Sequence, residues 1–396
     1  MSITNPSLGA YSLISTNPDT VDNSSSGGGF FEFARQVISE GGIVVGAAMD
    51  EKGKLILSKA SAETDLPNLM RSKYVQAEVG SIYKEIKEVL NTGTKVLFCS
   101  VPCYCNALYE YLQNDCDNLI VVDVICHGTP SPLLWEKYIK YRGFQDVQRV
   151  NFRDKRNGWS NYGISIASGE AEYFCDRRND PYMRLFLNNI SLRPSCYSCL
   201  FKGQYRRADI TLGDYWGVID YENKGVSLCI INTAKGKKFF ESISSELVTQ
   251  KVDAENALSH NTSFYKSVGL PLQRKKLFED LADGKEVFSS IEVYLKPSLY
   301  GKIIKGFRRL RRKIGNSNAL YVPYVHKEIN SLKQNCCGCG LCEQICPKDA
   351  IKMQKDKEGF MYPVTNQKLC INCGQCVKYC LNRSILRQDI REIQND

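Results

Sequence analysis

The hydrophobic positions of the first part of the chain fall into short continuous runs that alternate with amphipathic stretches. The short runs are rich in Val and Ile, which is typical of buried strands, whereas the amphipathic stretches repeat with helical spacing. We predict buried strands at Ile43–Met49, Lys95–Ser100 and Leu119–Ile125. Because the strands alternate with helices, they indicate a parallel α/β sheet, which binds ligands at the carboxyl ends of its strands.

The same periodicity places the other elements of this region. The predicted helices run from Phe30 to Ile38, from Ile82 to Leu90, through Leu108 and Leu112, and from near Ser131. Residues 10–15 are predicted to form an edge strand.

The pattern changes near residue 144, where short strands alternate with loops rich in Arg, Gly, Tyr and Trp. We predict strands within Ala208–Gly217 and at Ser227–Asn232, followed by a helix at Lys237–Glu246. This composition indicates an α+β second region. The two regions together are too long for one growing core, so we expect several domains.

Two cysteine runs near the carboxyl end share one spacing, C-x2-C-x2-C-x3-C, and this spacing is that of bacterial two-cluster ferredoxins. In such a run the fourth cysteine serves the other cluster. The spacing therefore predicts two [4Fe-4S] clusters, the first held by Cys336, Cys339, Cys342 and Cys380 and the second by Cys370, Cys373, Cys376 and Cys346. Zinc knuckles are the alternative, but zinc gives no reason for a third cysteine at the same spacing in both runs.

Residues around the two runs complete a small ferredoxin domain. Ala350–Met353 and Met361–Val364 are predicted to be two short strands joined by a turn. Cys337 is an extra thiol beside Cys336 that could compete with it for iron, without changing the assignment of the ligands.

These patterns divide the chain into four segments. Residues 1–140 form the N-terminal α/β domain and 141–300 the second domain; residues 301–330 form a basic linker helix and 331–396 the ferredoxin domain with a tail.

Charge and cysteine content limit the class of protein. The chain has 396 residues, 18 cysteines and a net charge of +9. No secretory leader and no membrane-spanning run is recognised, so the thiols indicate a reducing, cytoplasmic setting. Lys302–Lys313 is a basic amphipathic stretch, which is either a linker with solvated charges or a surface that makes weak contact with an anionic membrane. We expect no nucleic-acid binding, because no aromatic platform accompanies this charge.

A serine and glycine run, Ser24–Gly29, directly precedes the first predicted helix. Free backbone N–H groups and the helix dipole at such a place suit a phosphate group. The alternative is a flexible connector that ends in a helix cap.

Several segments together resemble the coenzyme F420 hydrogenase/dehydrogenase beta-subunit family of iron–sulfur flavoproteins. The similar segments lie between about residues 10 and 300. They are Ser24–Gly28, Ser72–Val75, Pro102-Cys103, Asp123–Gly128, Pro130–Pro132, Phe152–Lys155, Gly158-Trp159, Cys196–Cys199 and Ala208–Gly217.

The resemblance implies a flavin-binding α/β region that contains FAD. It implies that Ser26, Gly27 and Gly28 contact the phosphates of the flavin nucleotide and that Lys73 lies against the flavin or the substrate. The chain departs from the family in one loop, where Ser100–Tyr104 replaces the usual Gly-Thr-Pro-Cys-Gln. The ferredoxin module also lies at the carboxyl end, although it is often at the amino end.

Four further thiols extend this picture. Cys103 and Cys126 follow predicted strand ends, and Cys196 and Cys199 form a C-x2-C pair in the second region. We predict that these four thiols hold a third [4Fe-4S] cluster at the junction. A structural zinc ion and unligated buried cysteines remain the alternatives.

The predicted function is that of an iron–sulfur flavoprotein oxidoreductase. It exchanges electrons with a redox partner protein or ferredoxin and acts on a small-molecule substrate, F420 or another compound. His127 and Lys73 are the candidate catalytic residues, with His127 as proton donor or as a loop hydrogen-bonding residue. The competing interpretation is a non-catalytic electron-transfer subunit of a larger redox complex.

Overall fold

The structure is a computed structural model that describes residues 7–203, 206–218, 220, 222–296 and 331–382. Thirteen strands form three sheets within these residues. The strands are β1 (Gly9–Ser15), β2 (Ile43–Met49), β3 (Leu55–Ala60), β4 (Val96–Ser100), β5 (Leu119–Val124), β6 (Arg149–Asp154), β7 (Gly163–Ser168), β8 (Ala171–Asp176), β9 (Ile210–Asp214), β10 (Ser227–Ile231), β11 (Leu247–Val252), β12 (Ile351–Lys355) and β13 (Met361–Thr365).

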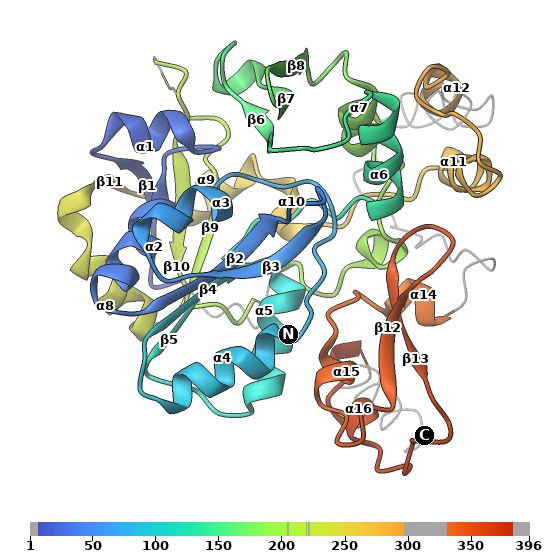
Figure 1. The fold of residues 1–396 in the computed structure, drawn as a ribbon. Coiled ribbons are helices and arrows are strands. Elements are labelled where there is room, and N and C mark those ends of the chain that lie inside the picture. Colours follow the sequence, from blue (N-terminus) through green and yellow to red (C-terminus); the bar gives the residue numbers. More distant parts are fainter. Residues whose placement is uncertain (1–6, 204–205, 219, 221, 297–330, 383–396) are drawn as a thin grey trace, which may run out of the picture.

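The largest sheet has eight strands in the order β11-β1-β10-β9-β5-β4-β2-β3 (Figure 1). β2, β4, β5 and β9 are parallel neighbours, and the outer pairs are antiparallel. The fold is therefore a mixed α/β sheet and not a purely parallel one. β9, β10 and β11 come from the segment expected to be a separate α+β region, and they pair in the same sheet as the N-terminal strands.

Short helices surround the sheets. The α-helices are α1 (Pro18–Asn23), α2 (Gly29–Ser39), α3 (Leu66–Leu69), α4 (Ile82–Asn91), α5 (Pro102–Leu112), α6 (Pro132–Tyr141), α7 (Pro181–Leu187), α8 (Ala234–Ser242), α9 (Ala254–Ser259), α10 (Thr262–Tyr265), α11 (Gln273–Ala282), α12 (Glu292–Leu295), α14 (Ser331–Asn335), α15 (Leu341–Gln344) and α16 (Gln375–Lys378). The 3-10 turns are Glu63–Asp65, Trp159–Asn161, Pro194–Ser198 and Ser244–Glu246.

The two faces of the large sheet carry separate cores, because successive residues of a strand point to opposite faces. Leu97 of β4 packs with Phe33 of α2 and Phe239 of α8 on one face. Phe98, the next residue, packs with Ile86 of α4 and Leu108 of α5 on the other. The continuous apolar runs therefore predict strands that are buried on both sides, as observed.

β1 is the clearest difference between the expected and the observed arrangement. Residues 10–15 form a strand as predicted, but the strand is not at an edge of the sheet. It pairs with β10 and with β11, whose residues follow it by more than 200 positions. Pairing at that sequence distance leaves no local signal in the sequence.

The ferredoxin-type domain consists of the β12-β13 hairpin with α14, α15 and α16, and it lies beside α4 and α5 (Figure 1). Leu341, Phe360, Tyr362 and Leu381 belong to the same buried apolar cluster as the helices of that sheet face. The two parts therefore share one core and do not merely touch.

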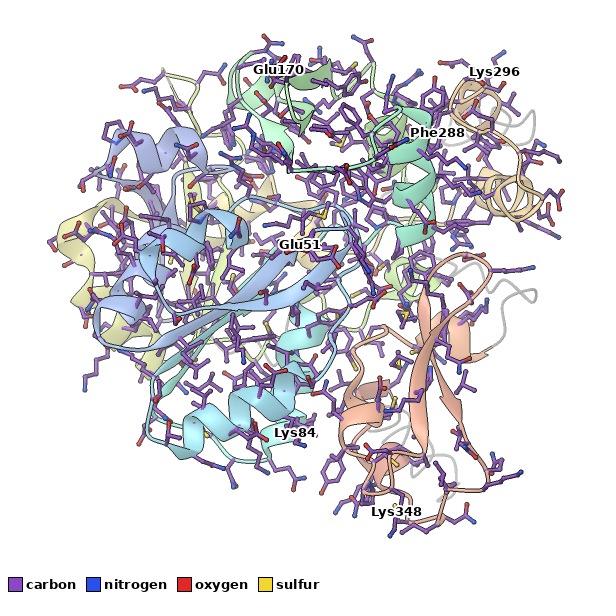
Figure 2. All side chains as sticks on the ribbon, viewed as in Figure 1. Glu51, Lys84, Glu170, Phe288, Lys296 and Lys348 are labelled. Carbon is purple, nitrogen blue, oxygen red and sulfur yellow. The ribbon has the colours of Figure 1, made fainter. Side chains whose placement is uncertain are left out.

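Polar contacts fix the angle of this docking. The side-chain oxygen of Gln344 accepts hydrogen bonds from the backbone N–H groups of Tyr83 (3.0 Å) and Lys84 (3.2 Å) at the start of α4. Arg274 of α11 pairs with Glu358 in the hairpin turn at 2.6 Å. Figure 2 labels Lys84 on the docking side and Lys348 at the far end of the ferredoxin-type domain.

Two expectations about membranes and linkers concern other parts of the chain. The helix expected at 301–330, with its basic stretch, lies outside the described residues. Among the described residues, no helix combines the length and the hydropathy needed to span a bilayer.

Candidate functional site

The carboxyl ends of β4, β5 and β9 open into a cavity of about 430 Å³. This volume lies within the range of typical ligand pockets. Residues from the serine and glycine run, from the strand ends and from the following loops line it, including Ser24, Ser25, Ser26, Gly28, Lys73, Ser100, His127, Arg153, Asp214 and Trp216. The sheet thus gathers the expected ligand residues where parallel strands place their ligands.

The serine and glycine run forms a tight cradle at the amino end of α2. Gly28 precedes the helix with φ of 90°, and no side chain caps the first turn. The N–H of Phe31 donates to the carbonyl oxygen of Gly28 at 3.0 Å, whereas the N–H groups of Gly29 and Phe30 have no partner among the described residues. A Cβ at Gly27 would lie 2.2 Å from the carbonyl oxygen of Leu13. Only glycine brings the backbone this close to β1.

Ser26 is the residue of the run that best indicates a ligand. Its side chain is 9% exposed, and its Oγ has no hydrogen-bond partner among the described residues. Buried hydroxyl groups are usually satisfied. The unpaired Oγ, the free N–H groups and the nearby cavity together fit the phosphate end of a nucleotide.

Arg153 is a buried cation in the cavity wall that sequence reasoning assigned no role. Its guanidinium donates to both carboxylate oxygens of Asp214, at 2.9 and 3.3 Å, and to the carbonyl oxygen of Ser25 at 3.5 Å. It also lies over the ring of Tyr162, 4.0 Å from the ring centroid. The ion pair ties β9 to the serine and glycine run and leaves the Arg153 charge compensated.

Lys155, on the same β6 side of the cavity, also holds the run in place. Its Nζ donates to the carbonyl oxygens of Val21 and Lys224, both at 2.6 Å. Burial lowers its pKa to about 8, with the neighbouring charge of Asp22 opposing the shift. Lys155 therefore supports the cradle from behind.

Lys73 lies in the cavity wall, where its Nζ donates to the carbonyl oxygens of Leu69, Met70 and Arg71 at 3.2, 2.5 and 3.2 Å. Burial, followed by the charge of Arg71, lowers its pKa to about 7. Near neutral pH the amine is thus partly uncharged and can either donate or accept a proton. Its contact with a flavin or a substrate stays a prediction.

His127 follows β5 and has hydrogen bonds at both ring nitrogens. Nε2 is 2.6 Å from Oδ1 of Asn189, and Nδ1 is 3.2 Å from the hydroxyl of Ser263. Burial lowers the pKa of His127, and Lys202 adds to the shift while Asn189 opposes it. A neutral ring with a proton on Nε2 donates to Asn189 and accepts from Ser263. These contacts support a loop hydrogen-bonding role, and the role of proton donor stays a prediction.

The four thiols of the expected third cluster lie around one small cavity next to the large one. The cavity is lined by Cys103, Cys126, Cys196 and Cys199. Cys103 lies at the start of α5 and Cys126 follows β5. Cys196 lies in the turn Pro194–Ser198, and Cys199 directly follows that turn. The Cys196 Sγ also accepts from the backbone N–H of Thr129 at 3.5 Å. The structure therefore brings together thiols from three separate stretches of sequence.

Cys337 is a fifth thiol at this cavity, and its competition with Cys336 for iron stays a prediction. It lines the small cavity with the other four thiols. A hydrogen bond with Cys337, followed by burial, raises the pKa of Cys103. Hydrogen bonds with Cys103 and Cys339 lower the pKa of Cys337. Cys337 therefore connects the ferredoxin-type domain to the thiols of the large domain.

The ferredoxin thiols fall into two neighbourhoods. Burial and then the thiolates of Cys336 and Cys380 raise the pKa of Cys342 to about 12. Burial and then Cys346 raise the pKa of Cys376, with smaller effects of Cys373 and Cys370. The last cysteine of each run thus lies with the other run, as the ferredoxin pattern requires. Ligand roles for individual cysteines stay predictions.

No group of three or more His, Cys, Asp or Glu side chains within the described part of the chain has the close spacing of a single-metal site. A zinc ion needs its sulfur ligands about 2.3 Å from one point.

The two cavities share a wall. Tyr104, Cys126, His127, Gly128 and Thr129 line both of them. Cys337 and Cys103 lie on the side of the ferredoxin-type domain, and the serine and glycine run lies on the other. The thiol cavity is therefore placed between the ferredoxin thiols and the large cavity.

Two segments of the chain match known protein families. Residues 93–256 match the family described as the C terminus of the coenzyme F420 hydrogenase/dehydrogenase beta subunit, and residues 335–383 match the 4Fe-4S dicluster domain.

Two curated relatives match the ferredoxin-type part. A ferredoxin-type protein NapF of Haemophilus influenzae is 28% identical over 74 residues, which are 18% of this chain and 42% of that protein. An uncharacterized ferredoxin of Methanocaldococcus jannaschii is 31% identical over 64 residues, which are 16% of this chain and 82% of that protein.

Among solved structures, a chain of the F420-reducing [NiFe] hydrogenase complex from Methanosarcina barkeri is similar, with a TM-score of 0.47 and 15% identity. The similarity covers 70% of this chain and 93% of that chain.

Proposed function

We propose that the chain is an iron–sulfur flavoprotein oxidoreductase. Residues 93–256 match the C-terminal part of the coenzyme F420 hydrogenase/dehydrogenase beta-subunit family, and residues 335–383 match a 4Fe-4S dicluster domain. The central observation is the wall shared by the thiol cavity and the large cavity. A third set of thiols between two redox sites is the arrangement that an electron-transfer path needs.

The chain's own residues supply the sites for the cofactors. Cys336, Cys339, Cys342 and Cys380 would hold one [4Fe-4S] cluster, and Cys346, Cys370, Cys373 and Cys376 the other. Cys103, Cys126, Cys196 and Cys199 would hold the third. Ser26, Gly27 and Gly28 would bind the phosphates of FAD, and Lys73 would lie against the flavin or the substrate.

When bound, the clusters supply one-electron chemistry and the flavin supplies the exchange between one-electron and two-electron chemistry. The residues set position, access and protonation. Arg153 and Lys155 hold the serine and glycine run in its conformation through Asp214 and backbone carbonyl groups. Lys73, with a pKa of about 7, holds or releases a proton at its Nζ near neutral pH.

Electrons would enter at the end of the ferredoxin-type domain that lies away from the large sheet. Cys373, in the second cysteine run, is exposed, whereas Cys337, beside Cys336 of the first run, lines the thiol cavity. A redox partner protein or a ferredoxin would dock at this end, and a small organic substrate, F420 or another compound, would enter the large cavity.

Ser26 provides the test of the flavin site. Ser26→Ala removes a hydroxyl that has no protein partner, so the fold should be unaffected. We expect the Kd for FAD to rise about 10- to 100-fold, the effect of losing a hydrogen bond to a charged group. The Kd is measured by adding FAD to flavin-free protein and recording the flavin fluorescence.

Ser39→Ala, at the other end of α2, is the matched control and should leave the Kd unchanged. Equal affinity of the Ser26→Ala variant and the wild type would remove Ser26 from the site. If the wild type does not bind FAD, the second candidate, a non-catalytic electron-transfer subunit, is favoured. The shared core of the two domains is consistent with that candidate as well. Steady turnover of F420 or another small molecule by the isolated chain would count against that candidate.

A further inference from the structure

Arg193 is a buried cation at the junction of the two domains, and its role is not explained by the site described above. It directly precedes the turn that carries Cys196, and its side chain is 0% exposed. Its backbone N–H donates to Thr129 and its carbonyl oxygen accepts from the N–H of Cys196, both at 2.9 Å. The residue is thus fixed at both ends beside the thiol cavity.

The guanidinium group reaches across the junction into the first cysteine run. Nε donates to the carbonyl oxygen of Cys336 at 2.8 Å, and Nη2 to the carbonyl oxygen of Met361 at 2.9 Å. Nη2 is also 3.6 Å from the Sγ of Cys336, and Nη1 donates to Oε1 of Gln76 at 2.8 Å. The side chain lies over the ring of Tyr362, 4.2 Å from the centroid. Every N–H group that points into the ferredoxin-type domain is therefore used.

These contacts include no carboxylate. Among the residues that the structure describes, Arg193 forms no ion pair with Asp or Glu; its acceptors are carbonyl oxygens, an amide oxygen and one sulfur atom. A buried cation without a counter-charge is strongly disfavoured. The group at Cys336 that carries negative charge is the thiolate itself, together with whatever the thiolate ligates.

We propose that Arg193 is a positioning residue that sets the redox potential of the cluster held by Cys336, Cys339, Cys342 and Cys380. This inference rests on the proposed iron–sulfur function. Reduction adds one negative charge to a cluster, and a fixed cation at a ligand sulfur atom stabilises the reduced state. Arg193 therefore raises the potential of the cluster nearest the large domain relative to the second cluster.

The consequence is a direction for electron flow inside the ferredoxin-type domain. With both clusters bound, an electron at the second cluster, whose ligand Cys373 is exposed, would be drawn toward the first, whose run neighbours Cys337 at the thiol cavity. The same guanidinium binds the loop of Cys336 to the turn of Cys196, so that docking and potential are set by one side chain.

Arg274 provides a matched control. It is also buried at this junction, 5% exposed, and also bonds the carbonyl oxygen of Leu192, the neighbour of Arg193. Its charge, however, is compensated by Glu358. Arg274→Gln therefore disturbs the docking without removing an uncompensated charge from Cys336.

The experiment is a potentiometric titration followed by electron paramagnetic resonance on the anaerobically purified full chain with its clusters. In Arg193→Gln we expect the midpoint potential of one of the two ferredoxin clusters to shift to more negative values, with the other unchanged. Arg193→Lys, which keeps the charge but not the fork of N–H groups, should lie between the Gln variant and the wild type. Arg274→Gln should leave both potentials at their wild-type values.

Unchanged potentials in both Arg193 variants, or an equal shift in Arg274→Gln, would overturn the proposal. If the Gln variant does not assemble clusters, the Lys variant decides. A potential below that of the wild type, with Arg274→Gln at the wild-type value, supports the proposal; a potential equal to that of the wild type, or an equal shift in Arg274→Gln, overturns it. A wild-type chain without two cluster signals would instead contradict the proposed function.

Discussion

At the large cavity, burial lowers the pKa of individual basic side chains. Lys73 and Lys155 both donate to backbone carbonyl oxygens, and burial lowers the pKa of each. Burial likewise lowers the pKa of His127, while its hydrogen bond to Asn189 opposes that shift. The residues that the sequence marked as candidate acids and bases are therefore also structural parts of their loops.

Lys73 gives a prediction about stability and pH. Its pKa is about 7 in the folded chain, and the unfolded chain keeps the ordinary lysine value near about 10.4. Between these two values the unfolded state binds more protons, so the free energy of unfolding rises with pH, by at most about 1.4 kcal/mol per unit. Lys73→Met removes the amine and should therefore remove the contribution of Lys73 to the increase of the unfolding free energy with pH.

Denaturant unfolding of both proteins at pH 7, 8 and 9, followed by tryptophan fluorescence, measures the difference. The unfolding free energy of the wild type minus that of Lys73→Met should increase as the pH rises from 7 to 9, because the wild type gains stability that the variant does not. Parallel pH profiles would show that Lys73 has an ordinary pKa.

At the scale of elements, the success of sequence reasoning depended on whether the contacts are local. The strand expected at Ile43–Met49 was found with the same bounds, because an apolar run between glycines and a turn specifies a buried strand by itself. β1 was expected at an edge and lies inside the sheet, because both of its neighbours come from the distant segment 227–252.

The same distinction holds for the site. The spacing of the two cysteine runs predicts which cysteines share a cluster. Three ligands of each cluster lie on one short loop, and the fourth comes from the other run. The position of Cys337 was not predicted, because its neighbour Cys103 is far away in the sequence. Arg193 gave no signal in the sequence, because an arginine before a loop turn is ordinary until its partners are known. Arg153 lay in one of the segments that resemble the family, but its pairing with the distant Asp214 was not predicted.

The ion pair between Arg274 of α11 and Glu358 of the hairpin turn gives a prediction for docking. Both side chains are nearly buried, 6% and 13% exposed. Glu358→Gln leaves Arg274 uncompensated, and losing one partner of a buried pair costs about 3–5 kcal/mol. Amide hydrogen exchange at Tyr83 and Lys84, whose N–H groups bond to Gln344, reports the opening of the junction and should become faster.

Lys355→Met is the control for this experiment. Lys355 pairs with Glu78 across the same junction, but at 3.8 Å and with 45% and 20% exposure. Exposed pairs contribute about 0–1 kcal/mol, so exchange at Tyr83 and Lys84 should change little. Equal effects of both variants would mean that Arg274–Glu358 does not hold the domains together.

At the scale of the whole molecule, the ferredoxin-type domain is part of the fold's core. Its apolar residues join the cluster on one sheet face, and its Cys337, beside the first cysteine run, lines the thiol cavity. The thiol cavity in turn shares a wall with the cavity at the strand ends. The molecule is therefore arranged as a series of three sites, with the exposed cysteine run at one end.

The content of iron, acid-labile sulfide, zinc and flavin per chain in anaerobically purified protein tests this account most directly. We expect about twelve irons, an equal amount of sulfide, no zinc and one FAD in the wild type. Replacing Cys196 and Cys199 by serine should remove about four irons and leave the ferredoxin irons in place. Replacing Cys116 and Cys175, which lie outside the three thiol groups, should remove none. About eight irons in both the wild type and the Cys196/Cys199 variant, with no flavin, would contradict the series of three sites and leave an electron-transfer subunit.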